Sequence, residues 1–172
     1  LLIERGANIN AAEKKKSQTA LMWAAAEGHS EIVSLLIESG ADAKAVSKTG
    51  YCALAFAVAK NDRQSVKKLL AAGADPNFKL SDGSSLLIAA AAFRNSEAAI
   101  ALVEAGADIK SVDRRNNTPL HIAAQMGQVE LVKLLLAKGS DPNARNAKVP
   151  GAVGPNPFRP QPGEVTPLHL AA

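Results

Sequence analysis

The sequence has almost no cysteine, since Cys52 is the single one among 172 residues. An internal disulfide framework and a metal site built from several thiolates are therefore excluded. Aromatic side chains are also scarce, at 3% of the chain. Alanine and leucine must supply most of the core, and such small side chains suit helices that approach one another closely.

Long apolar runs are missing as well, because none approaches the roughly 20 residues that a membrane-spanning helix needs. The chain begins with Leu1 instead of methionine and shows no signal peptide. We therefore expect a fragment of a longer protein that is soluble and cytoplasmic by default, with export left open because the natural N-terminus is missing. The net charge of +4 is a mild bias towards acidic partners and is too small alone to indicate nucleic acid.

Glycine marks a regular repeat in what the sequence does contain. Successive members of one set of glycines are 33 residues apart, and each is followed by a small residue and then an aspartate: Gly40, Gly73, Gly106 and Gly139. Two columns of leucine keep the same period: Leu21, Leu54, Leu87 and Leu120, then Leu36, Leu69, Leu102 and Leu135. A period held by both turn residues and apolar residues predicts a solenoid of stacked units.

Each unit contains two short segments with a helical pattern. In the segment 118–124, Thr118 can cap the helix with its hydroxyl, and Pro119 suits the first helical position, where no backbone N–H is needed. The segment 129–136 has one broad apolar face, and Glu130 lies in its first turn, where the helix dipole favours an anion. Gly139 then follows as a left-handed C-terminal cap.

Three motifs carry a resemblance to a known family: TPLHIAA at 118–124, GHSEIV at 28–33 and GADPN at 73–77, with TPLHLAA at 166–172 starting another copy. They resemble the ankyrin repeat, and the resemblance covers nearly the whole chain. It implies a single all-α ankyrin-repeat domain over 1–172, a solenoid of helix–turn–helix units with hairpin-like loops. We expect full repeats at 13–45, 46–78, 79–111 and 112–144, a partial repeat at 1–12 and the start of another at 164–172. The array should then continue in the parent protein, because each unit needs neighbours to cover its apolar faces.

Two departures from the repeat lie in loops. The first unit has one extra residue, which we place near Lys14–Lys16. About 15 residues are inserted in the loop 145–163, which is rich in proline and glycine and cannot form a helix or a central strand. We interpret it as a long hairpin tip on the binding edge of the stack. It is either a tolerated surface loop or, through Pro157-Phe158-Arg159-Pro160, a P-x-x-P ligand segment.

A third departure precedes the second helices of the middle units. There Asn61-Asp62 and Arg94-Asn95 replace the Gly-His pair of the family. Asparagine tolerates the left-handed conformation of this turn, so we expect the fold to survive.

The histidines and the cysteine are interpreted as structural. His29, His121 and His169 occupy positions where the family uses the imidazole as an internal hydrogen-bonding group, and no second metal ligand lies at helical or hairpin spacing. Cys52 replaces a capping threonine, which predicts a buried or half-buried, inert thiol instead of a nucleophile. The aspartates after the glycines predict turn formers. With no phosphate-binding glycine motif either, we expect no catalytic residue, no cofactor, no metal and no enzyme activity.

One column of large side chains is expected in the core. Trp23 and Phe56 occupy the same position in successive units, matched by Ala89 and Ile122. We expect this column to pack between units, because a core role is commoner for such residues than a ligand cage.

The resemblance also implies where partners bind. In the family they are usually gripped by the hairpin tips and by the exposed side of the first helices, which form a concave groove; we call this the tip-and-groove side. Carried over position by position, it consists of Lys15, Lys16, Gln18, Glu27, Lys48, Thr49, Tyr51, Lys60, Ser81, Asp82, Ser84, Phe93, Arg114, Arg115, Asn117, Gln125 and Met126. Tyr51, Phe93 and Met126 are apolar groups that should face solvent and are candidate anchors. Alternatively, they shield neighbouring hairpins.

Charge is concentrated on the tip-and-groove side. Its bases are Lys14, Lys15, Lys16, Lys48, Lys60, Arg94, Arg114 and Arg115. Its acids are Glu27, Asp82 and Asp113, which leaves a net charge of +5 on this side of a chain that carries +4. We therefore predict a partner with an acidic surface and binding that weakens with added salt.

The leading functional hypothesis is a monomeric, non-catalytic protein-interaction scaffold, with no small-molecule substrate and no membrane insertion. A second hypothesis is a regulatory or targeting segment of a larger enzyme, channel or secreted effector. Nucleic-acid binding through the basic face is disfavoured, because the groove is poor in aromatics for stacking and the bases form no continuous track.

Overall fold

The computed structural model describes residues 6–146 and 165–171. Within these ranges the chain forms four successive helix pairs and one further short helix. The pairs are α1 (Ala20–Glu27) with α2 (Ser30–Glu38), α3 (Ala53–Ala59) with α4 (Arg63–Ala71), α5 (Leu86–Ala92) with α6 (Ser96–Glu104), and α7 (Pro119–Gln125) with α8 (Val129–Ala137). The short helix α9 (Pro167–Ala171) packs against α7.

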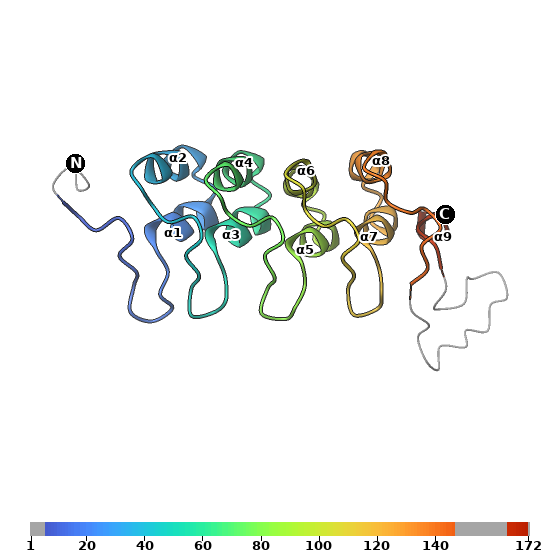
Figure 1. The fold of residues 1–172 in the computed structure, drawn as a ribbon, viewed down its shortest axis with the longest axis horizontal. Coiled ribbons are helices and arrows are strands. Elements are labelled where there is room, and N and C mark those ends of the chain that lie inside the picture. Colours follow the sequence, from blue (N-terminus) through green and yellow to red (C-terminus); the bar gives the residue numbers. More distant parts are fainter. Residues whose placement is uncertain (1–5, 147–164, 172) are drawn as a thin grey trace.

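The helix pairs stand side by side in an elongated stack (Figure 1). The second helices α2, α4, α6 and α8 form one row, which we call the outer face, and the first helices form a parallel row beyond which the hairpin loops project (Figure 1). The described residues contain isolated β-bridges but no strand. The predicted all-α solenoid is therefore confirmed.

The helix starts follow the predicted caps. The hydroxyl of Thr118 accepts the backbone N–H of His121, and Pro119 occupies the first helical position. Thr19 and Ser85 cap α1 and α5 in the same way, whereas Cys52 makes no side-chain cap at α3. Cys52 is buried, as predicted, and this burial raises the pKa of its thiol.

The turns after the second helices repeat one geometry. The four glycines of the 33-residue period have φ between 86° and 89°, a left-handed conformation that glycine adopts without strain. In each unit the following aspartate accepts a backbone N–H two residues later, at 2.8 or 2.9 Å. These bonds confirm that Asp42, Asp75, Asp108 and Asp141 form turns.

The core runs the length of the stack and consists of the predicted leucine columns with alanines between them. The leucines of the first column are at most 1% exposed, and those of the second are at most 8% exposed. Alanines fill the spaces between helices, as Ala25, Ala57, Ala91 and Ala123 show with exposures of 0%. Burial of similar columns in every unit explains why the period could be read from the sequence.

The left-handed position before the second helices is occupied by a different residue in each middle unit. Asn61 has a φ of 58°, which confirms the expectation for asparagine. In the next unit the expectation is wrong, because Arg94 is the left-handed residue, with a φ of 60°, and Asn95 has a φ of −82°. Its guanidinium donates to the carbonyl of Met126 from Nε at 3.2 Å and from Nη2 at 2.6 Å. This link to the next unit offsets the strain of the conformation.

The hairpins differ in length where the sequence does. Bridged residues are seven positions apart in the first hairpin, Ala12 and Thr19, and six apart in the next two. The extra residue therefore lies within the first hairpin, where the turn covers Lys14–Lys16.

The proline-rich insertion, including the P-x-x-P segment, lies outside the described residues. Its flanks are described, because the N–H of Asn146 donates to the carbonyl of Val165 at 3.3 Å. The equivalent bond closes the preceding hairpin between Asp113 and Asn117 at 3.0 Å.

The prediction that Trp23 packs in the core is wrong, since Trp23 is 54% exposed. Its equivalents Phe56 and Ala89 are half-buried, and Ile122 is 5% exposed. The flank of α1 and α2 explains part of this difference, because Ile32 is 47% exposed whereas its equivalent Leu131 is fully covered by the preceding unit. Exposure at a repeat position therefore depends on the neighbouring units as well as on the residue.

Candidate partner-binding surface

The hairpin tips are closed by carboxylates that accept backbone N–H groups. Asp113 Oδ1 accepts from the backbone of Arg115 and of Asn117, both at 2.8 Å, and Oδ2 accepts from the Asn117 amide at 2.9 Å. Asp82 accepts from the backbone of Ser84 at 2.9 Å. Glu13 accepts from the backbone of Lys15 at 2.7 Å and also from that of Lys16. The acids of the tips are therefore engaged with their own backbone.

These hydrogen bonds lower the pKa values of two tip carboxylates, Asp82 and Glu13. The hydrogen bonds from Ser84 lower the pKa of Asp82, and the charge of Arg114 lowers it further. For Glu13, desolvation acts upwards but is outweighed by three backbone N–H groups and the charge of Lys48, so its pKa is lowered too. Both groups carry their negative charge at neutral pH.

The bases of the tip-and-groove side form no close ion pair with a carboxylate in the described part of the chain. All eight are exposed, and within 6–146 and 165–171 none of them forms an ion pair. Lys48 Nζ donates to the carbonyl of Lys14 at 3.1 Å, and Arg94 is bound to Met126 as described above. The guanidinium groups of Arg114 and Arg115 are exposed and form no ion pair in this part of the chain, although the charge of Arg114 acts on Asp82.

A hollow of about 350 Å³ lies between the third and fourth hairpins. It brings together seven of the residues predicted for partner binding: Asp82, Ser84, Arg114, Arg115, Asn117, Gln125 and Met126. Ala92, Asp113 and Ile122 complete its lining. Its lining thus combines hairpin residues with first-helix residues, the two kinds of element that the resemblance assigns to the groove.

The three candidate anchors differ in exposure. Phe93 is 77% exposed. Tyr51 is 37% exposed and rests against Phe56, with 5.7 Å between the ring centroids and 33° between the planes. The expectation that Met126 faces solvent holds only in part, because its side chain is half-buried against the core while it borders the hollow.

The remaining predicted residues are spread along the stack. Those in hairpins are Lys15, Lys16, Gln18, Lys48, Thr49 and Ser81. Glu27 is exposed at the end of α1, and the aliphatic part of Lys60 lies beside Gly28 in the neighbouring unit. Trp23 was not among the residues predicted for partner binding, but its repeat equivalent Ile122 lines the hollow.

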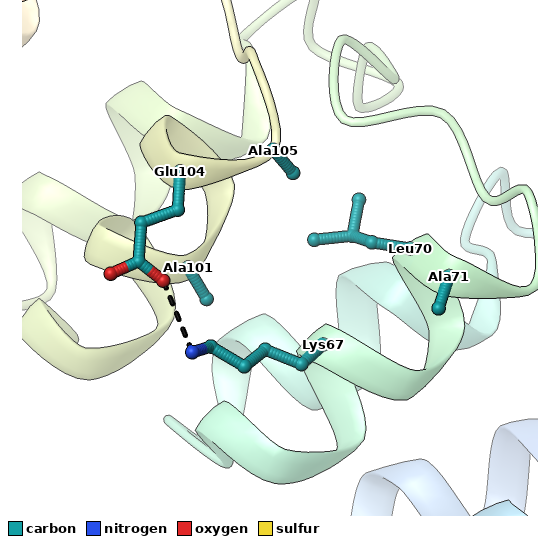
Figure 2. A pocket seen from close by; sticks show the side chains of 6 residues that line it. All are labelled: Lys67, Leu70, Ala71, Ala101, Glu104 and Ala105. Carbon is teal, nitrogen blue, oxygen red and sulfur yellow. Dashed lines mark ion pairs between the residues drawn. The ribbon is translucent and has the colours of Figure 1, made fainter.

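A second hollow, also of about 350 Å³, lies on the outer face between α4 and α6. Its floor is formed by Leu70, Ala71, Ala101 and Ala105, and an ion pair between Lys67 and Glu104 at 3.1 Å borders it (Figure 2). The small side chain of Ala101 leaves this space where the adjacent units carry Lys68 and Leu134. Since its charges are already paired, this hollow offers an incoming charge no free partner.

The histidines show no reactive arrangement. His121 is fully buried, with Nδ1 at 2.8 Å from the Thr118 hydroxyl and Nε2 at 3.1 Å from the carbonyl of Val165. These contacts confirm its structural role. His169 repeats the first contact with Thr166 at 2.8 Å. The prediction of an internal hydrogen-bonding group is wrong for His29, which is exposed and does not cap α2 with its side chain. In the described ranges no group of three histidine, cysteine or acidic residues could hold a metal ion, and no helix is long and apolar enough to cross a membrane.

Comparisons with known proteins agree with this architecture. A family model described as ankyrin repeats in three copies matches residues 1–79 and 54–146. A putative ankyrin repeat protein of Rickettsia bellii (strain RML369-C) is 58% identical over 36 residues, which are 21% of this chain and 5% of that protein. The transient receptor potential cation channel subfamily A member 1 of Homo sapiens is 47% identical over 38 residues, 22% of this chain and 3% of the channel. The matched stretches thus span about a twentieth or less of these relatives.

The family match covers well over half of the sequence, and it coincides with the helix pairs, the glycine turns and the capped first helices. Ankyrin repeats generally mediate protein–protein interaction and are typically non-catalytic. The chain belongs to the ankyrin-repeat family.

Proposed function

We propose that this chain is a non-catalytic scaffold that binds a partner with an acidic surface through its hairpin tips and the concave face of its first helices. The observation that carries the proposal is that the charged side chains of the tip-and-groove side form no ion pairs with one another in the described residues. Asp82 and Asp113 are engaged with backbone N–H groups of their hairpins, while the eight exposed bases form no ion pair among the described residues. An acidic partner would supply the missing counter-charges, and long-range attraction would accelerate the encounter.

The test is a triple charge reversal, Lys16→Glu, Lys48→Glu and Arg115→Glu, in one chain. A partner captured with the unmodified chain should associate more slowly with this variant, by about tenfold or more at low salt, and added salt should reduce the difference. The matched control reverses Lys44, Lys110 and Lys138, three exposed lysines outside the tip-and-groove set. Unchanged association of the tip-and-groove variant at low salt, or equal slowing in the control, would contradict the proposal.

A second candidate function is a regulatory or targeting segment of a larger enzyme, channel or secreted effector. It is supported by the small share of each relative that the matched stretches span. One of these relatives is named as a cation channel. This candidate is compatible with partner binding. It predicts that the chain, fused to its native neighbouring sequence, alters an activity located outside 1–172, which is measured by comparing that activity with and without the repeats.

We also propose the repeat boundaries given above, with full units at 13–45, 46–78, 79–111 and 112–144 and the insertion at 145–163. Each unit then contains one hairpin, one helix pair and one glycine turn. The support is the recurrence of the aspartate turn bond in all four units.

A further inference from the structure

The hollow between the third and fourth hairpins is formed by units that other helices flank on both sides. Helix α5 packs against α3 and α7, and α7 packs in turn against α9. The lining of the hollow comes from both hairpins, from the end of α5 and from α7 with the residue that follows it. Its shape and exposure therefore depend on neighbours that the structure describes on either side.

The apolar part of the lining consists of Ala92, Ile122 and Met126. Ala92 is exposed at the end of α5, Met126 is half-buried, and Ile122 is 5% exposed. The volume of about 350 Å³ lies near the lower end of the range of roughly 300–1,000 Å³ that is typical of ligand sites. The hollow can therefore receive a side chain of a partner, and an apolar one would remove apolar surface from water on both molecules.

The charged part of the lining contains two arginines and two aspartates. Asp82 accepts the backbone N–H of Ser84 at 2.9 Å, and Asp113 accepts that of Arg115 at 2.8 Å. The charge of Arg114 acts on Asp82, while the guanidinium of Arg115 is exposed and forms no ion pair in the described part of the chain. Because the four charges balance, the hollow suits an occupant with one carboxylate at Arg115 better than a polyanion.

Gln125 is the one long side chain in its column of the four full units. The equivalent positions of the earlier units carry alanine: Ala26, Ala59 and Ala92. The side chain of Gln125 is exposed and makes no hydrogen bond within 6–146 and 165–171. Since a primary amide both donates and accepts, Gln125 can bind the C=O and N–H groups of an extended peptide backbone.

We propose that this hollow binds an extended peptide segment of the partner protein, in which one aliphatic side chain stands next to one carboxylate. The aliphatic side chain contacts Ala92, Ile122 and Met126, and the amide of Gln125 binds the peptide backbone. The carboxylate forms a charge-assisted pair with the guanidinium of Arg115. An apolar contact bordered by a specific charge pair provides both affinity and selectivity. This inference rests on the proposed function and names the chemistry of the segment that the partner presents.

The lining favours a peptide over single-stranded nucleic acid. Asp82 and Asp113 would repel a phosphate backbone, whereas a segment with one carboxylate needs only one guanidinium. None of the residues that line the hollow is aromatic, and base stacking needs aromatic platforms. The hollow thus offers an apolar contact and one charge pair instead of a track for a polyanion.

The probe is a phage-displayed library of random seven-residue peptides, selected on the immobilised full chain and counted by sequencing. The selected peptides should contain leucine, isoleucine or valine next to aspartate or glutamate about tenfold more often than the unselected library. A second selection uses a chain with Arg114→Glu and Arg115→Glu, in which the backbone N–H groups that bind Asp113 remain. The preferred charge of the peptides should then change from acidic to basic, which a merely structural role of the arginines would not produce.

The most abundant selected peptide, synthesised with fluorescein at its N-terminus, measures affinity by fluorescence anisotropy. Ala92→Trp fills the hollow and should weaken binding about tenfold or more, whereas Ala59→Trp, the same change at the exposed equivalent position one unit earlier, should not. Gln125→Ala should weaken binding about fivefold, and Gln64→Ala is its control because Gln64 is exposed on the outer helix α4. If circular dichroism shows that Ala92→Trp unfolds, Gln125→Ala and Gln64→Ala carry the comparison.

Four outcomes would overturn the inference. These are no enrichment of the aliphatic–acidic pair, an acidic preference that persists after both arginines are reversed, equal weakening by a hollow variant and its control, and displacement of the peptide by oligothymidylate. If no pair is enriched while the reversal of Lys16, Lys48 and Arg115 still slows a captured partner, the proposed function stands and this inference fails. If that reversal has no effect and no pair is enriched, both fail.

Discussion

The outer face and the tip-and-groove side of the stack differ in how their charged side chains are paired. On the outer face, Arg63 pairs with Glu97 at 2.9 Å and with Glu104 at 3.0 Å, and Lys67 also pairs with Glu104. On the tip-and-groove side, no base forms an ion pair within the described ranges, although acids are present there. Between α4 and α6 the outer face pairs its own charged side chains, whereas the bases of the other side form no ion pair in the described part of the chain.

The difference arises from what the carboxylates bind. Glu97 and Glu104 of α6 reach across to bases on α4, while Glu13, Asp82 and Asp113 turn back onto the backbone of their own hairpins. A count of charged residues therefore understates the contrast between the faces. Changes on the tip side should alter hairpin geometry and binding, and changes on the outer face should alter stability alone.

The largest stability effect is expected for Asp113→Ala. The substitution removes the acceptor of two backbone N–H groups and one amide, and water replaces it incompletely in this half-buried tip. The free energy of unfolding should fall by about 1–2 kcal/mol, measured in urea. Asp113→Asn removes the same charge but keeps one acceptor oxygen, so it should lose less. Equal stability of all three proteins would show that this carboxylate does not hold the tip.

Arg94 should give the next largest effect. Arg94→Ala keeps a left-handed residue with a side chain and loses both bonds to the carbonyl of Met126. Arg94→Gly loses the same bonds but relieves the strain, so it should be more stable than the alanine variant by about 1 kcal/mol. Thermal unfolding of the two variants measures the difference. An alanine variant as stable as the glycine variant would contradict the assigned strain.

Glu104→Gln tests the paired face. The change leaves Arg63 with one acid and Lys67 with none, and it should cost at most about 1 kcal/mol because all three side chains are partly exposed. Partner binding should be unchanged. A loss of binding together with unchanged stability would reverse the assigned roles of the two faces.

The pH dependence of the same carboxylate has a defined sign. The hydrogen bond from Lys67 lowers the pKa of Glu104, and the charges of Lys67 and Arg63 lower it further against desolvation. A depressed pKa in the folded state means that the stabilisation is present above the unfolded pKa and is lost as the pH falls through the folded value. The stability difference between wild type and Glu104→Gln should therefore shrink in acid, as urea titrations at several pH values would show.

The sequence predicted the fold well because its determinants are local and repeated. Each first helix needs a cap and each turn a left-handed residue, and the same leucine columns are buried in every unit. Trp23 was misjudged because its exposure depends on the helices beside it, which a position in a repeat does not specify. The prediction that Met126 faces solvent held only in part for the same reason, because the core residues that partly cover its side chain are brought there by the tertiary structure.

The site could be predicted as a set of positions but not as a set of interactions. The hollow unites seven predicted residues because hairpin and helix positions recur in register. The hydrogen bonds that engage Asp82 and Asp113 depend on the conformation of each tip, so the sequence could not show that these acids leave the bases unpaired. The pairing of Arg63 with Glu97, 34 residues apart, would require the repeat register and the side-chain directions together.

Spacing alone could have found one ion pair, and we expect that pair to contribute least. Glu130 and Lys133 are three residues apart on α8 and meet at 2.9 Å, with side-chain exposures of 72% and 66%. Water and salt screen such a pair, so Lys133→Ala should change the free energy of unfolding by no more than about 0.5 kcal/mol and should leave partner binding intact. Urea unfolding beside Glu104→Gln measures both on one scale. A larger loss from Lys133→Ala than from Glu104→Gln would show that pairs within a helix, and not links between units, maintain the outer face.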